Sequence, residues 1–181
     1  MNASSLVLVG PLLAALAGCA AHSAATSPST ARALPATARA LPADLDLLTG
    51  PAWHGTLTYL DYQSRKPVSI RSTLLVTRLP GGARRWEERL GYDDEPHANR
   101  AEVVALSDDG RVLDGQEVVA REALPDGGVR VVTEAEGEDD NRPARFRHVY
   151  LLGARESSLQ KLVRFAGTLE FFERNRYAWK R

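Results

Sequence analysis

Cysteine is almost absent from this chain of 181 residues, and neither sign of charge is in excess. The single cysteine excludes an intramolecular disulfide and a zinc site built from several thiolates, because both need a second sulfur atom. The 23 basic residues balance the 23 acidic residues, which argues against a disordered polyelectrolyte and against a nucleic-acid partner. Beyond the N-terminal residues, no apolar run reaches the roughly 18 residues that a membrane-spanning helix needs.

The sequence also lacks the short motifs of common enzyme classes. It contains no Gly-x-Ser-x-Gly, no His-Glu-x-x-His, no phosphate-binding loop and no dinucleotide-binding fingerprint. Residues 93–97 and 136–141 offer clustered oxygen ligands, but neither has the alternating spacing of an EF-hand calcium loop. We interpret both segments as solvated acidic turns, and we expect no catalytic residue, no metal and no cofactor.

The N-terminal residues have the pattern of an export signal. Residues 6–17 are apolar apart from one Gly-Pro pair, and they lead into Leu16-Ala17-Gly18-Cys19. This sequence resembles the lipobox of bacterial lipoproteins, in which the thiol is diacylated and the chain is cut before the cysteine. The resemblance implies a signal peptide over residues 1–18 and lipid attachment at Cys19. Because alanines rather than aspartate follow Cys19, it also implies the outer membrane, facing the periplasm. The alternative is an ordinary buried cysteine.

Residues 19–48 predict a linker between this anchor and a folded domain. From residue 20 to about 46 the composition is dominated by Ala, Ser, Thr, Pro and Arg, with a seven-residue echo over 31–37 and 38–44. Such a segment buries too little apolar surface to offset its ordering entropy. A partner-binding repeat is the alternative, and residues 45–49 are expected to form one helical turn before the domain.

Residues 49–181 predict an all-β domain. Short alternating runs are separated by Gly, Pro and Asp, and no stretch has a convincing helical period. Turn residues at 80–82, 109–110 and 125–128 favour hairpins between successive strands. We expect an antiparallel up-and-down β-barrel of about eight to ten strands, because closure removes exposed sheet edges; a two-layer sandwich is the alternative. The nine expected strands are 54–62, 68–78, 83–92, 101–107, 111–122, 128–136, 144–152, 158–166 and 169–179.

The start of this domain resembles a known family. Residues 50–57, Gly-Pro-Ala-Trp-His-Gly-Thr-Leu, resemble the Gly-x-Trp opening of lipocalins, in which an arginine packs over the tryptophan and plugs the closed end. The resemblance implies that Trp53 closes the barrel together with Arg174 or Arg176. Residues 53–62, 93–99 and 139–141 are also similar to uncharacterised bacterial secreted proteins of lipocalin-like type, which implies a fold and a location but no activity.

The strand phases also select candidate binding residues. The alternation of side chains along the expected strands places Glu88, His148 and Glu173 on the inward face, where an ionised group needs a partner or a water-filled cavity. The alternatives are that each of these side chains sits at a rim or pairs with an arginine, and that the inward aromatic residues are ordinary core. We expect a ligand site lined by Tyr59, Trp86, Glu88, His148, Tyr150 and Glu173.

Three functions remain open on the sequence, because a barrel of this size either holds one small ligand or is filled by its own side chains. The main hypothesis is an anchored binding protein for a small apolar or amphipathic ligand. A structural or assembly lipoprotein, with a solid barrel whose outer wall meets an envelope protein, is the alternative. An enzyme that uses an inward Glu and His as acid and base comes third. A hollow interior favours the first, and a filled interior with an exposed apolar patch favours the second.

Overall fold

The computed structural model of the chain describes residues 38–81 and 84–181. Cys19, the expected signal peptide and most of the expected linker lie outside the described residues. The described elements, in chain order, are α1 (Pro42–Asp46), β1 (Trp53–Asp61), β2 (Lys66–Arg78), β3 (Arg85–Tyr92), the short 3-10 helix η1 (Pro96–Ala98), β4 (Arg100–Ala105), β5 (Val112–Leu113), β6 (Gln116–Ala123), β7 (Val129–Asp139), β8 (Arg142–Leu152), β9 (Glu156–Phe165) and β10 (Phe172–Lys180).

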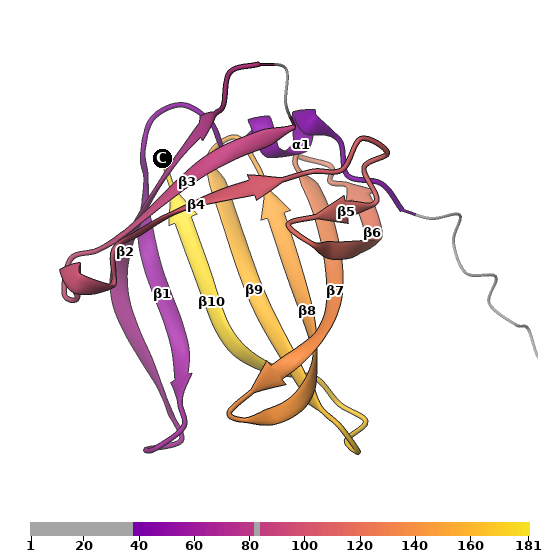
Figure 1. Cartoon of the computed structure of the whole chain (residues 1–181). Coiled ribbons are helices and arrows are strands. Elements are labelled where there is room, and N and C mark those ends of the chain that lie inside the picture. The colour runs from indigo at the N-terminus through magenta and orange to yellow at the C-terminus, as the bar shows by residue number, and fades with distance from the viewer. Residues whose placement is uncertain (1–37, 82–83) are drawn as a thin grey trace, which may run out of the picture. The chain divides into compact units, whose positions relative to one another are not determined.

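Ten antiparallel strands form one sheet that curls into a nearly closed barrel (Figure 1). The order in the sheet is β4-β3-β2-β1-β10-β9-β8-β7-β6-β5, so sequential strands are neighbours and the first strand pairs with the last. An antiparallel bridge between Leu106 and Leu113, beside the ends of β4 and β5, joins the two edges of the sheet. The expected up-and-down antiparallel barrel is confirmed, and the two-layer sandwich is not formed.

The two ends of the barrel differ in how completely the strands pair. β3 pairs with β2 only over Ser72–Arg78, and β6 pairs with β7 only over Val129–Glu134. The remaining halves of β2 and β7 have no strand partner on those sides, so they extend beyond β3, β4 and β6 (Figure 1). We call the part of the barrel in which β2 and β7 lack these strand partners the open half. We call the end that holds α1 and the start of β1 the closed end.

Turn chemistry explains why there are ten strands and not nine. The segment 111–122, expected as one strand, is interrupted by Asp114 and Gly115, which adopt positive φ angles of 51° and 74°. Such angles at two central residues are what a tight hairpin turn requires, and Asp-Gly is a preferred pair for it. The expected turns at Gly81, Gly110 and Gly127 are confirmed by φ angles of 96°, 73° and 81°.

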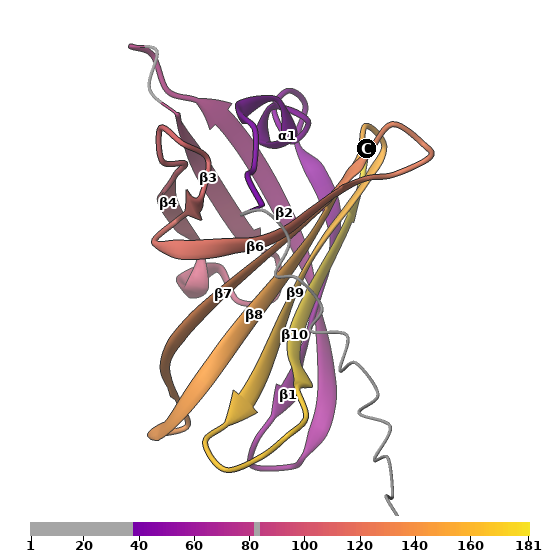
Figure 2. The ribbon, with the colours of Figure 1, turned by 90° about the vertical axis from the view of Figure 1, so that its right-hand side faces the viewer.

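The residues before β1 pack into the closed end. Ala40, Leu45 and Leu48 are buried in the same core as the inward side chains of the strands. Figure 2 shows α1 between the strand ends. The folded part therefore begins before residue 49, and the described second copy of the seven-residue echo, residues 38–44, belongs to it. Among the described residues, no helix is long and apolar enough to cross a membrane.

A buried ion pair fixes α1 to the wall of the barrel. Asp44 is 3% exposed, and Arg121 of β6 donates two hydrogen bonds to its carboxylate, at 2.8 and 2.7 Å. The backbone N–H of Leu41 donates a third, at 2.8 Å. Both oxygens of this carboxylate thus accept hydrogen bonds from other residues of the chain, which is how a buried charge is tolerated.

Trp53 lies at the closed end as the resemblance implies, but a different arginine covers it. Its side chain is fully buried, and its indole N–H donates to the carbonyl of Leu48 at 2.8 Å. The guanidinium of Arg181 lies 4.1 Å from the centroid of the Trp53 ring. It also donates hydrogen bonds to the carbonyls of Thr49 and Leu47, at 2.8 and 2.9 Å.

The expected partners of Trp53, Arg174 and Arg176, lie elsewhere because of the strand register. In the β1–β10 pairing, His54 lies opposite Lys180, whereas Arg176 lies opposite Thr58. On the β10 side, it is therefore the last residues of the described chain that lie beside the start of β1. The assignment of barrel closure to Arg174 or Arg176 is corrected to Arg181.

Candidate functional site

The open half of the barrel contains a cavity of about 470 Å³. This volume is within the range of small-molecule sites in proteins, roughly 300–1,000 Å³. Strands β1, β2, β8, β9 and β10 supply most of the wall, and η1 with the adjacent end of β3 supplies another side. The lining combines apolar, tyrosine and ionisable side chains: Leu57, Tyr59, Ile70, Tyr92, Glu95, Ala98, Arg100, Asp139, His148, Leu159, Lys161, Arg174, Asn175 and Tyr177.

Two tyrosines separate the cavity from the filled closed end. The hydroxyls of Tyr92 and Tyr177 lie 2.6 Å apart, and Arg100 donates to the hydroxyl of Tyr92 at 3.0 Å. Arg100 is also paired with Glu102 at 2.7 Å. Burial and the hydrogen bond to Tyr177 raise the pKa of Tyr92, so the Tyr92 phenol remains a neutral hydrogen-bonding group at physiological pH.

A second polar group lies at the open half, where Asp139 faces two cations. Its carboxylate accepts a hydrogen bond from the hydroxyl of Tyr62. The ammonium of Lys161 lies 3.6 Å from one carboxylate oxygen, and the Nε of Arg174 lies 3.7 Å from the other. Both separations exceed a normal hydrogen-bond distance, so Asp139 neutralises the two cations only loosely.

A β-bulge turns Arg174 towards this cavity. The register between β10 and β9 shifts between Glu173 and Asn175, which places one extra residue in β10. The guanidinium of Arg174 lies 4.1 Å from the centroid of the Tyr62 ring and donates to the carbonyl of Leu60. Bulges commonly redirect a side chain in this way next to a binding site.

His148 is held in one tautomer by two residues behind it. Its Nδ1 lies 2.7 Å from the amide oxygen of Gln116, which also accepts a hydrogen bond of 2.7 Å from the hydroxyl of Thr133. Because a carboxamide oxygen only accepts, Nδ1 carries the proton, and Nε2 is left as an acceptor. Burial and the charge of Lys161 lower the pKa of His148 to about 4. The cavity wall therefore contains a neutral imidazole.

Glu88 and Tyr150 are half-buried and lie outside the cavity lining. Glu88 is opposite Glu102 in the β3–β4 register, and burial together with Asp114 and Glu102 raises its pKa to about 7. Burial and then Glu88 raise the pKa of Tyr150. The Tyr150 ring lies 6.4 Å from that of His148. Neither Glu88 nor Tyr150 is among the residues that line the cavity.

The structure thus brings together only part of the expected ligand site. Tyr59 and His148 line the cavity, and Glu88 and Tyr150 do not. Trp86 is fully buried at the closed end, where its indole N–H donates to Asp46 at 2.9 Å. Trp86 is therefore a core residue and does not line the cavity.

Glu173 does not face the cavity, which corrects its expected inward orientation. It pairs in register with Leu162, accepts a hydrogen bond from Gln160 and forms an ion pair of 2.6 Å with Arg176. The expected phase assumed strict alternation along β10, and the bulge after Glu173 reverses that phase. This pairing with an arginine is one of the alternatives that the sequence left open.

Sequence reasoning missed the cations of the cavity. Lys161 shares its strand face with Leu159 and Val163. A charged residue among apolar residues of the same face was therefore the feature of the sequence that could have identified it. Arg174 gave no comparable signal, because its direction depends on the bulge. No group of three or more His, Cys, Asp or Glu side chains within residues 38–81 and 84–181 is arranged to hold a metal ion.

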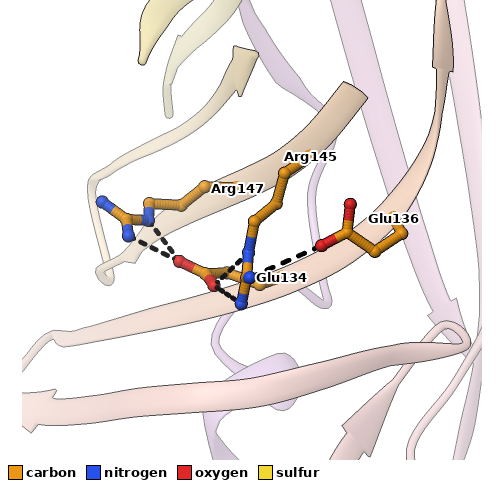
Figure 3. Close-up of polar contacts among 4 residues, drawn as sticks. All are labelled: Glu134, Glu136, Arg145 and Arg147. Carbon is orange, nitrogen blue, oxygen red and sulfur yellow. Dashed lines mark hydrogen bonds and ion pairs between the residues drawn. The ribbon is translucent and has the colours of Figure 1, made fainter. Parts of the chain in front are cut away.

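The outer wall contrasts with the cavity in how its charges are paired. Figure 3 shows Glu134 of β7 between Arg145 and Arg147 of β8. The shortest contacts are 2.6 Å to Arg145 and 2.5 Å to Arg147, and Glu136 adds a contact of 3.4 Å to Arg145. Although burial opposes ionisation, the two arginines hold the pKa of Glu134 below its usual value. These outer charges are satisfied within the wall.

Exposed apolar side chains on the described surface are distributed over several segments. The large ones are Leu41, Leu75, Val103, Val112, Leu151 and Leu169, which belong to six different strands or connections. Single exposed apolar residues of this kind are normal on soluble surfaces. They do not by themselves define a docking surface.

Comparison with known proteins adds no family assignment. No protein-family model matches the chain, and no curated protein matches it significantly.

Proposed function

We propose that this protein is a lipid-anchored carrier or sensor of the cell envelope whose barrel binds one small amphipathic molecule. The observation that carries the proposal is the cavity of about 470 Å³ in the open half, with apolar and ionisable side chains in the same lining. A barrel serving only as a solid scaffold has no need of charged groups around an interior space. The hollow half therefore favours a binding role over the structural alternative.

The lining supports an amphipathic ligand because it contains both apolar and polar groups. Leu57, Ile70 and Leu159 offer a surface for an apolar body, where burial contributes about 25 cal/mol per Å². Lys161 and Arg174 offer donors for a polar end. Polar groups at fixed positions in a pocket are what orient a small ligand.

The proposal includes an anchor at Cys19, which rests on the lipobox-like sequence and lies outside the described residues. Acyl chains on this residue would hold the barrel at the outer membrane, because each buried CH₂ contributes about 0.8 kcal/mol and more than one chain gives stable anchoring. The Trp53–Arg181 contact at the closed end supports a lipocalin-like relationship for the barrel. Cell fractionation of the Cys19→Ser variant tests the anchor, and retention in the membrane fraction would refute it.

Native mass spectrometry of the gently extracted chain tests the binding role. We expect an adduct of small-molecule mass on the wild-type protein. The variant Ile70→Trp places a large ring in the cavity and should lose the adduct. Ser69→Trp is the matched control, because Ser69 is the neighbouring, exposed residue of β2, hydrogen-bonded to Thr58 on the outer face. An adduct that survives Ile70→Trp, or a wild-type protein without any adduct, would contradict the proposal.

A further inference from the structure

We propose that Lys161 and Arg174 form an anion-binding subsite inside the cavity, so that the bound molecule carries a carboxylate. This inference rests on the proposed function and specifies the chemistry of the ligand's polar end. Its basis is that two cations share one carboxylate in the wall, and that one of them lacks a hydrogen-bond partner.

Lys161 is the cation with unused donors. Its ammonium lies 4.3 Å from the centroid of the Phe146 ring and 3.6 Å from Asp139. Within residues 38–81 and 84–181 it donates no hydrogen bond that meets normal geometry. Its side chain is 25% exposed, so the ammonium does not extend far into bulk water. An ammonium has three N–H donors, and a ligand oxygen in the cavity would fill at least one.

Arg174 supplies the second donor group. One of its nitrogens is committed to the carbonyl of Leu60, and its plane is stacked on Tyr62. This leaves further guanidinium donors beside the cavity, because a guanidinium has five N–H groups. The bulge and the two contacts hold Arg174 in place before a ligand arrives, which lowers the entropic cost of binding.

The charges around the subsite are mixed. Asp139 faces both cations and already accepts the hydroxyl of Tyr62. Hydrogen bonds within its own turn, and then the charge of Arg174, lower the pKa of Asp61, and Glu95 lines the cavity. The next cation, Arg100, is paired with Glu102. The unused donors of Lys161 and Arg174, and not the net charge, therefore select the polar end of the ligand: an anionic oxygen satisfies them and a cationic group cannot.

His148 provides a reporter of the bound charge. It lies opposite Lys161 in the β8–β9 register, and its other neighbours, Gln116, Thr133 and Tyr150, are uncharged. Burial and Lys161 lower its pKa to about 4. An anion placed against Lys161 offsets the second of these causes. Binding of a carboxylate should therefore raise the pKa of His148, and binding of a neutral molecule with the same chain should not.

Three probes with one alkyl chain and different head groups separate the possibilities: octanoate, octan-1-ol and octyltrimethylammonium. Their affinities are measured by calorimetry on the full chain in lipid nanodiscs, with empty nanodiscs as the blank. We expect octanoate to bind about tenfold more tightly than octan-1-ol, because hydrogen bonds between charged groups are stronger than those to a neutral group. Lys161→Gln should remove most of this preference.

Lys180→Gln is the matched control. It removes the same charge from an exposed lysine that pairs with Glu156 at the closed end, so the preference for octanoate should persist. Equal binding of octanoate and octan-1-ol, or tighter binding of octyltrimethylammonium, overturns the anion subsite while leaving a binding cavity in place. Failure of all three probes overturns the subsite, and loss of the mass-spectrometric adduct separately refutes the binding role.

The histidine measurement keeps the test independent of any variant's folding. The pKa of His148 is followed by NMR in the wild-type protein with octane-1-sulfonate, which stays ionised in the range where His148 titrates and a carboxylate does not, and with octan-1-ol. A rise with the sulfonate and none with octan-1-ol supports the subsite. An identical pKa with both probes overturns it.

Discussion

At the closed end of the barrel, the inward residues form a filled core, whereas in the open half the same strands enclose a cavity with charged walls. Trp53, Trp86 and Leu45 are each no more than 2% exposed. In the open half, Tyr59 and Leu159 line the cavity with Lys161 and are only partly buried. Both regions obey the alternation of a β-barrel, so alternation alone does not decide whether a barrel is filled.

The difference arises from what enters each end. At the closed end, α1 and the preceding residues add apolar side chains from outside the sheet, and Arg181 covers Trp53. In the open half no comparable segment of the described chain enters, and the strands on one side stop early. A filled core favours stability and a hollow region favours binding, so mutations in the two regions should have different effects.

The largest expected effect is on stability at the closed end. Leu45→Ala should lower the free energy of unfolding by about 2–5 kcal/mol, because a buried leucine is replaced and its site cannot fully collapse. Leu159→Ala, in the cavity wall, should cost about 1 kcal/mol, since its side chain is only partly buried. Urea unfolding of both variants checks the contrast. Similar losses for the two leucines would mean that the open half is packed as tightly as the closed end.

Glu88 of β3, which is outside the cavity lining, should make stability depend on pH. Its folded pKa of about 7 is above the ordinary value of 4.5, so the folded state binds the proton more tightly than the unfolded state. Stability is therefore lost as pH rises from about 4.5 to 7 and stays lost above that. Glu88→Gln should stabilise the protein by roughly 1–3 kcal/mol at pH 8 and have little effect at pH 4.

Glu87→Gln is the control for this titration. Glu87 is the preceding residue of β3 and pairs with Arg89 at 2.9 Å, so its removal should give no gain that grows with pH. The measurement is urea unfolding of both variants at pH 4 and pH 8. If Glu88→Gln raises the free energy of unfolding by the same amount at both pH values, the folded state does not raise the pKa of Glu88.

The sequence was most informative where local chemistry dominates. Alternation and Gly-containing turns predicted the strand order and the barrel. Asp114-Gly115 carried a turn signal that would have given the tenth strand. These features depend on a few neighbouring residues, so they are visible without knowledge of the distant parts of the chain.

The candidate site was less predictable because it depends on register and on volume. A single bulge in β10 reverses the phase at Glu173 and redirects Arg174. The register of β1 against β10 decides that Arg181, and not Arg176, reaches Trp53. The volume of the cavity is the small difference between the space that the strands enclose and the volume of the side chains inside it. The order of polar and apolar residues along the chain does not give this difference.

The smallest expected effects separate the two arginines whose roles the sequence confused. Arg181→Gln should lower stability by about 1 kcal/mol, because it loses a cation–π contact with Trp53 and hydrogen bonds at an exposed site, and it should leave octanoate binding unchanged. Arg174→Gln should also lower stability by about 1 kcal/mol, because it loses its contact with Tyr62 and its hydrogen bond to Leu60, but unlike Arg181→Gln it should weaken octanoate binding. Thermal unfolding and calorimetry on both variants measure this. If Arg174→Gln destabilises the fold and spares binding, Arg174 is structural, and the distinction between a filled closed end and a ligand-binding open half fails at that residue.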